Sequence, residues 1–198
     1  TGLVFAEPVA ELGLAMALAM HAAFKGRGIL RTVVLVPWAV LTVVSAITWR
    51  TLFEPNLGLV PTVLGKLGIA ENVVWLGQEG YAMAVMVLAD VWKTAPFMAL
   101  LLLAGLQVIP DDVYDAAKVD GATAWQRFRR ITLPLLVPAI LVALIFRTLD
   151  ALRIFDLPFV LTRGTNGTNT LSLEAQQTLV NNGVIGLGSA LSVLTFAT

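Results

Sequence analysis

The stretch that decides the fold is Ile109–Pro138, IPDDVYDAAKVDGATAWQRFRRITLPLLVP. It is polar for most of its length, yet it lies between two apolar runs, Tyr81–Leu106 and Leu133–Leu161. Each run is long enough to cross the hydrocarbon core of a bilayer, which takes about 20 residues. Because an isolated open strand cannot satisfy its backbone in lipid, we expect two membrane helices joined by a polar surface segment.

Within this polar segment, Pro110 can open a helix, and Asp111 and Asp112 follow where negative charge favours the helix dipole. Small residues recur at near-helical spacing after them, and Gly121 permits a turn between two short helices. Such a helix can lie in a groove of another protein. It can equally rest on lipid headgroups as an interfacial helix, and the residues alone leave both interpretations open.

Three further apolar runs surround this pair: Leu3–Phe24, Ile29–Phe53 and a last one that begins near Leu187. Hydrophobic residues make up 58% of the 198-residue chain and charged residues only 13%, well below the quarter or so typical of soluble domains. We therefore expect an all-α integral membrane protein, a polytopic helical bundle. The chain starts at Thr1 and stops inside an apolar run, so we expect it to be the middle of a longer protein, truncated at both ends.

Basic residues predict the orientation of the bundle. The first connector carries Lys25 and Arg27, and the third carries four basic residues between Lys118 and Arg130. The positive-inside rule therefore places connectors one and three in the cytoplasm. The two outer connectors, 54–80 and 162–187, are expected to form turns, with a short helix at Leu171–Leu179.

Several kinds of chemistry are not expected from this sequence. Cysteine is absent, and His21, the only histidine, has no partner at metal-ligand spacing, so no metal site is predicted. There is no Gly-x-x-x-x-Gly-Lys-Ser/Thr phosphate loop and no catalytic triad. The formal net charge of zero gives no sign of nucleic acid as a partner. We expect a protein that is not an enzyme and binds no cofactor itself.

The fourth apolar run contains Arg147, Asp150 and Arg153, spaced to share one helical face. Ionised residues inside a membrane cost about 3 kcal/mol each on insertion scales, so they usually face a bundle interior or a wet cavity. They line a translocation pathway in one interpretation and form a structural ion pair in the other. Two alternatives also stay open for Trp92 and Lys93, which either contact a sugar or anchor the helix at the interface.

The polar segment resembles a known signature. Asp115-Ala116-Ala117, then Gly121, then Ile131-x-Leu133-Pro134 resembles the "EAA" motif of binding-protein-dependent ABC importer permeases, with Asp115 in place of Glu. This resemblance implies the type I, MetI-like permease fold and a coupling loop at about 109–134. It also implies that this loop docks into the ATPase subunits through the signature residues, which are Asp115, Ala116, Ala117, Gly121, Ile131, Leu133 and Pro134.

Other stretches resemble the sugar permeases of that family, such as Trp49–Gly58, Trp92–Phe97 and Leu103–Pro110. Leu144–Asp156, LIFRTLDALRIFD, is similar to trehalose- and maltose-type permeases of the first-chain kind, whereas Thr165-Asn166 departs from the family's Gly-Pro. By position in the family, the resemblance places substrate-facing residues on two helices. Together with the charged Asp150, the expected pathway residues are Thr94, Phe97, Arg147, Asp150, Ala151 and Ile154.

The function implied by the resemblance is ATP-driven import of a di- or oligosaccharide by alternating access. The implied partners are a second permease subunit, a dimer of ATP-binding subunits that holds ATP and Mg, an extracytoplasmic solute-binding protein, the sugar and the lipid of the plasma membrane. The alternatives are a secondary transporter or channel without an ATPase, which would not need the coupling segment, and a membrane scaffold without transport.

Overall fold

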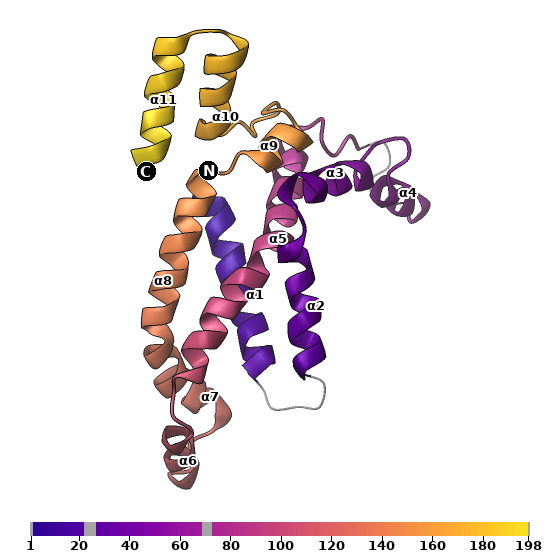
Figure 1. The fold of residues 1–198 in the computed structure, drawn as a ribbon. Helices are drawn as coiled ribbons and strands as arrows, with labels where there is room; N and C mark the ends of the chain where they lie inside the picture. Colours follow the sequence, from indigo (N-terminus) through magenta and orange to yellow (C-terminus); the bar gives the residue numbers. More distant parts are fainter. Residues whose placement is uncertain (1, 22–26, 69–72, 198) are drawn as a thin grey trace.

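The computed structural model describes residues 2–21, 27–68 and 73–197, and in these ranges it contains helices and turns but no strand (Figure 1). The all-α prediction is therefore confirmed for the described chain. The longer helices are α1 (Gly2–His21), α2 (Arg27–Ala39), α3 (Thr42–Leu52), α5 (Glu79–Gln107), α8 (Leu133–Leu152) and α11 (Ile185–Ala197). The shorter ones are α4 (Leu59–Lys66), α6 (Asp111–Val119), α7 (Ala124–Arg127), α9 (Asp156–Leu161) and α10 (Leu171–Gln176), with π-helical turns at Phe128–Thr132 and Gln177–Asn181.

Helix α5 is the axis of the bundle, and α1, α2 and α8 pack along it. Two glycines let its neighbours approach closely. A Cβ atom on Gly13 would lie 2.5 Å from Cγ of Met98, and a Cβ on Gly105 would lie 2.5 Å from Cβ of Ala139. Small residues at such crossings are the usual means by which apolar helices pack without a large hydrophobic driving force. The main core therefore lies between α1, α5 and α8.

Two helical stretches in the described chain are long and apolar enough to cross a membrane, Glu79–Gln107 and Ala124–Leu161. A third exists if α2 and α3 are taken together, but these two helices are bent by 89° relative to each other. The prediction of one continuous segment over Ile29–Phe53 is therefore wrong. Pro37 lies inside α2, which continues to Ala39, and the helical path ends where Leu41 takes a φ of −56° and a ψ of 135° before α3 begins.

The opposite ends of the bundle carry different segments. Helices α6 and α7 lie at one end, together with the last residue of α1 and the start of α2 (Figure 1). Helices α3, α4 and α9 lie at the other end, with α10 and α11 beyond them. The two helix ends that flank the first connector thus lie at the same end of the bundle as the third connector, as the basic residues predicted. Lys25 and Gly26 lie outside the described residues.

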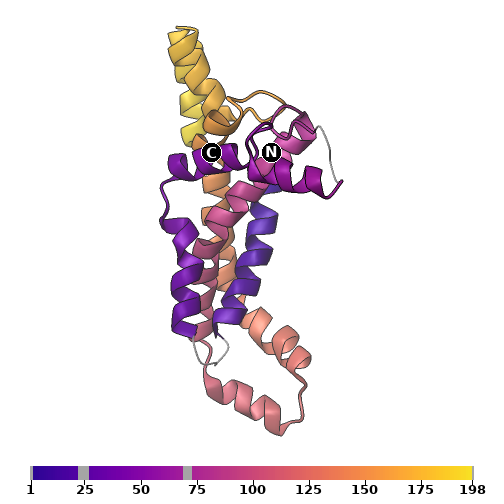
Figure 2. The same ribbon diagram turned by 90° about the vertical axis from the view of Figure 1, so that its right-hand side faces the viewer.

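The polar segment forms two short helices with a break at Gly121, as predicted. Gly121 adopts a φ of +76°, its N–H donates to the Lys118 carbonyl, and the Ala122 N–H donates to the Ala117 carbonyl. This pair of bonds is the Schellman arrangement that ends a helix and favours glycine. Thr123 then caps α7 through a reciprocal pair of bonds with Gln126. Figure 2 shows α6 projecting beyond the ends of the bundle helices.

The fourth apolar run is divided between α8 and α9, because the chain leaves the helix at Arg153. Arg153 therefore does not continue the helical face of Arg147 and Asp150, which corrects the expectation of three charges in one row. The predicted short helix at Leu171–Leu179 is present as α10 followed by a π-helical turn. Thr170 caps α10 by accepting a hydrogen bond from the Leu173 N–H at 3.4 Å.

Candidate functional site

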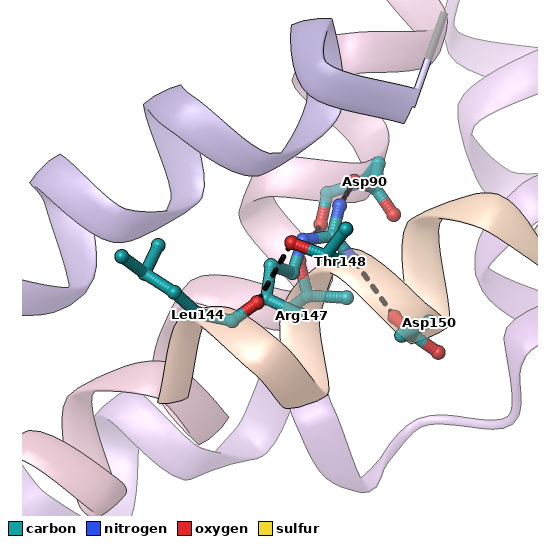
Figure 3. Close-up of polar contacts among 6 residues, drawn as sticks. Asp90, Leu144, Arg147, Thr148 and Asp150 are labelled. Carbon is teal, nitrogen blue, oxygen red and sulfur yellow. Dashed lines mark hydrogen bonds and ion pairs between the residues drawn. The ribbon is translucent and has the colours of Figure 1, made fainter. Parts of the chain in front are cut away.

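A buried ion pair joins α5 to α8. Asp90 and Arg147 lie 57 residues apart in sequence, and they are only 3% and 5% exposed. The Arg147 guanidinium donates to Asp90 Oδ2, and its Nη1 donates to Asp150 Oδ2 at 2.7 Å (Figure 3). The side chain of Asp150 is 67% exposed, so one end of this cluster is buried and the other is open. A buried charge is tolerated when it is paired and hydrogen-bonded in this way.

A cavity of about 560 Å³ opens beside this cluster, where the α2–α3 bend faces α5 and α8. It brings together Thr94, Phe97, Arg147 and Asp150, four of the six residues expected along the pathway. Ala151 and Ile154 are not among its lining residues. Ala151 is buried against α3 and α5, and Ile154 packs against the same apolar cluster. Their expected contact with substrate stays a prediction.

Aromatic rings form one side of the cavity. Trp38 of α2 and Phe97 of α5 are stacked, with ring centroids 5.8 Å apart and ring planes 11° from parallel. Both side chains remain partly exposed, Trp38 at 50% and Phe97 at 39%. Aromatic faces and a few hydrogen-bonding groups are the usual combination in sites for small polar ligands.

The side chain of Lys93 has a defined contact in the bend. Its ammonium donates to the carbonyl of Val40, one residue before α3 is capped. The interrupted helix would otherwise leave this carbonyl without a partner, and that is costly in an apolar setting. Lys93 therefore stabilises the bend in this conformation. The neighbouring Trp92 packs edge-on against Trp49, at 6.0 Å between centroids.

Sequence reasoning missed Asp90. A single carboxylate in an apolar run gives little signal, and its partner Arg147 lies on another helix. Helical spacing is the signal that could have indicated Asp90, because it precedes Lys93 and Thr94 by three and four residues and so lies on the same helical face. Arg153, which was expected in the charge row, instead donates to the Phe196 carbonyl at 3.1 Å and lies over the Phe196 ring.

The signature residues of the polar segment lie together at the far end of the bundle. Asp115 is exposed and pairs with Lys118 at 2.7 Å, Ala116 is exposed, and Ala117 is buried. Ile131 and Leu133 are half-buried, and Pro134 is exposed. Large apolar side chains are also open to solvent here, with Val119 88% exposed and Trp125 65% exposed. Exposed apolar surface of this kind typically marks an interaction site.

The comparisons with known proteins agree with this geometry. The model of the family of binding-protein-dependent transport system inner membrane components matches residues 11–198. The chain belongs to this family. It is therefore a component of a membrane transport system, in a family of transport proteins rather than of enzymes.

Among curated relatives, the chain is 53% identical over 187 residues to the trehalose/maltose transport system permease protein MalF of Thermococcus litoralis, covering 93% of this chain and 63% of that protein. It is 46% identical over 185 residues to the trehalose transport system permease protein SugA of Mycobacterium tuberculosis, covering 93% and 59%. It is 43% identical over 188 residues to the sulfoquinovosyl glycerol transport system permease protein SmoG of Agrobacterium fabrum, covering 94% and 61%. The chain thus spans about three fifths of the length of these relatives.

Solved structures show the same fold. A bacterial alginate ABC transporter, crystallised with its alginate pentasaccharide-bound periplasmic protein, matches with a TM-score of 0.87 and 25% identity, over 98% of this chain and 70% of that one. A second structure of a bacterial ABC transporter for alginate import matches with a TM-score of 0.85 and 26% identity, over 96% and 71%. The fold is that of ABC importer permeases, as the resemblance implied.

Proposed function

We propose that this chain is the transmembrane permease subunit of an ATP-driven importer that moves a di- or oligosaccharide of the trehalose or maltose type. The observation that carries the proposal is the cavity between the α2–α3 bend, α5 and α8. Its volume falls within the range of about 300–1,000 Å³ typical of small-ligand sites. The names of the curated relatives, which transport trehalose and maltose, support this substrate class.

The chemistry of the cavity fits a sugar. Trp38 and Phe97 offer aromatic faces against which the C–H faces of a sugar ring can pack. The exposed carboxylate of Asp150 can accept hydrogen bonds from sugar hydroxyls, and Thr94 carries a hydroxyl of its own. Arg147 is held by Asp90 and Asp150 and thereby fixes the position of Asp150.

The family and the exposed surface of α6 and α7 support a set of partners for this chain. We infer that this surface docks on a dimer of ATP-binding subunits, which holds ATP and Mg, and that Asp115, Ala116 and Gly121 lie at the contact. A second permease subunit and an extracytoplasmic solute-binding protein complete the assembly. We infer that the protein crosses the plasma membrane several times, with α6 and α7 on the cytoplasmic side, as the basic residues of the connectors indicate.

The mechanism links these two regions. ATP closes the ATPase dimer, α6 moves with it, and the bundle responds as a rigid body because α5 and α8 are closely packed at Gly105. Access to the cavity then changes from the outside to the inside, in the general manner of alternating access.

The test is uptake of radiolabelled trehalose and maltose by the full-length protein, reconstituted in proteoliposomes with its partner subunits and binding protein. We expect ATP-dependent uptake that falls at least tenfold in Phe97→Ala, because the cavity loses half of its stacked pair. Phe159→Ala is the matched control, since Phe159 lies outside the cavity and is 43% exposed. Uptake of neither sugar, or equal loss in both variants, would contradict the proposal.

A further inference from the structure

A second cavity lies at the other end of the bundle, where the ends of α1, α2 and α5 meet α6 and α7. Its volume is about 1,060 Å³, and none of its lining residues belongs to the cavity described above. Its lining is amphipathic, because it combines the apolar side chains of Leu18 and Leu106 with the cationic side chains of Arg31 and Arg127.

Both arginines are held in place by backbone carbonyls. Arg31 Nη2 donates to the Met20 carbonyl at 3.2 Å, and Arg127 Nη1 donates to the Ala122 carbonyl at 2.7 Å. A guanidinium has five N–H donors, so each keeps further donors for a ligand. One of these donors, Arg31 Nε, is buried and has no hydrogen-bond partner within residues 2–21, 27–68 and 73–197. A buried donor without a partner calls for an acceptor.

The charges around the cavity favour a singly charged anion. Lys118 and Asp115 also line it, but they pair with each other at 2.7 Å. Of the remaining lining residues, Arg31 and Arg127 carry two positive charges and Asp111 carries one negative charge. The lining therefore has one excess positive charge when His21 is taken as neutral. Arginine is the side chain best suited to phosphate oxygens, since its planar fork can donate two parallel bonds.

The position of the cavity points to lipid. His21 is the last residue of α1 and Gln107 is the last of α5, so the cavity lies where the apolar helices end. A ligand there meets apolar side chains on the membrane side and arginines beside them. Basic pockets between membrane helices on the cytoplasmic side are known binding places for phospholipid headgroups.

We propose that this cavity binds the phosphodiester group of an anionic membrane phospholipid, with Arg31 and Arg127 donating to the phosphate oxygens and Asp111 accepting from headgroup hydroxyls. The bound lipid joins α2 to α7 and so braces the polar segment against the bundle. The inference rests on the proposed function only in placing this end of the bundle at the cytoplasmic leaflet. Val119, the most exposed apolar residue of α6, is not part of the lining, whereas Asp115 both lines the cavity and lies at the proposed contact with the ATPase, so the lipid site and the docking surface adjoin at Asp115.

The test is native mass spectrometry of the full-length protein in its assembled transporter, titrated in detergent with phosphatidylglycerol or phosphatidylcholine. Wild type should retain phosphatidylglycerol in preference to phosphatidylcholine. Arg31→Gln and Arg127→Gln should each weaken it about tenfold, the effect of losing one charge-assisted hydrogen bond of roughly 1.4 kcal/mol. Arg129→Gln is the matched control, because Arg129 is exposed and does not line the cavity, and it should leave retention unchanged.

Four results would overturn the inference. Equal retention of both lipids, or unchanged retention in the double variant Arg31→Gln/Arg127→Gln, would show that no such site exists. Displacement of the lipid by millimolar inorganic phosphate would identify a site for a soluble anion. If the double variant lost the ATPase subunits but still retained lipid, Arg31 and Arg127 would bind the protein partner and not the lipid. Sugar uptake by wild type is measured separately, so failure here leaves the proposed function standing.

Discussion

Asp90 of α5 and Arg147 of α8 form a buried ion pair beside the larger apolar core of the bundle, and Asp150 extends the pair to an exposed surface. The pair fixes the position of α5 relative to α8 along the helix axes. It also places a charged cluster against the wall of the cavity proposed to hold sugar. Stability and transport are therefore expected to depend on the same residues.

Removing one member of this pair should cost more than removing both. Arg147→Met leaves Asp90 buried without its cation, and Asp90→Asn removes the buried carboxylate that pairs with Arg147. Breaking a buried pair typically costs about 3–5 kcal/mol, whereas replacing both partners with apolar groups is often close to neutral. Thermal unfolding in detergent should therefore show lower Tm values for each single variant than for Asp90→Leu/Arg147→Met. Asp150→Asn is the control, and as an exposed partner it should cost less than about 1 kcal/mol.

Lys93 should be needed for the bend between α2 and α3. Lys93→Met preserves the apolar stem but removes the ammonium that donates to the Val40 carbonyl. Leaving this part-buried carbonyl without a partner costs at most about 1–3 kcal/mol, so we expect lower stability and faster hydrogen exchange at Val40 and Leu41. Lys66→Met on α4 is the matched control, because Lys66 is exposed and has no such contact among the described residues. Identical exchange at the bend in both variants would exclude this role of Lys93.

The crossing of α5 and α8 should tolerate no side chain at Gly105. A Cβ there would meet the Cβ of Ala139 at 2.5 Å, so Gly105→Ala forces the helices apart. Overpacking of this kind costs about 1–3 kcal/mol. Gly80→Ala in the same helix has open space and should be neutral or stabilising by up to about 1 kcal/mol, through helix propensity. If Gly105→Ala unfolded at the Tm of Gly80→Ala, the close packing of α5 and α8 would be refuted.

The turn after α6 should depend on backbone conformation rather than on space. Gly121 has a φ of +76°, yet a Cβ there would meet nothing within 4 Å. Gly121→Ala should therefore destabilise by about 1–2 kcal/mol, the cost of a left-handed residue, and Gly121→Asn by less, since Asn tolerates that region. Hydrogen exchange at Gly121 and Ala122 would report the loss. If the amides of residues 121 and 122 were as well protected in both variants as in wild type, the turn would not rely on glycine.

Much of this fold could be predicted from the sequence because local patterns determine it. Apolar runs specified α5 and α8, and a glycine after a short amphipathic pattern specified the end of α6. The α2–α3 bend could not be predicted, because Pro37 can sit within a helix, and the bend is held by Lys93 from a helix more than 50 residues away. The same holds for Asp90, whose role depends on Arg147 across the bundle. Long-range pairing leaves no periodicity in a single sequence.

The central claim is that α6 couples this chain to an ATPase, and co-purification of the full-length protein with the ATPase subunits of its transporter tests it most directly. Wild type is compared with Gly121→Asp and with the matched control Gly68→Asp. Gly68 has a φ of +68° and equally open space, and it follows α4, which lies at the other end of the bundle. We predict that wild type and Gly68→Asp retain the ATPase, whereas Gly121→Asp loses it and stays folded in detergent. If wild type itself retained no ATPase, the claim would be contradicted, and a transporter without an ATPase partner would be the better account.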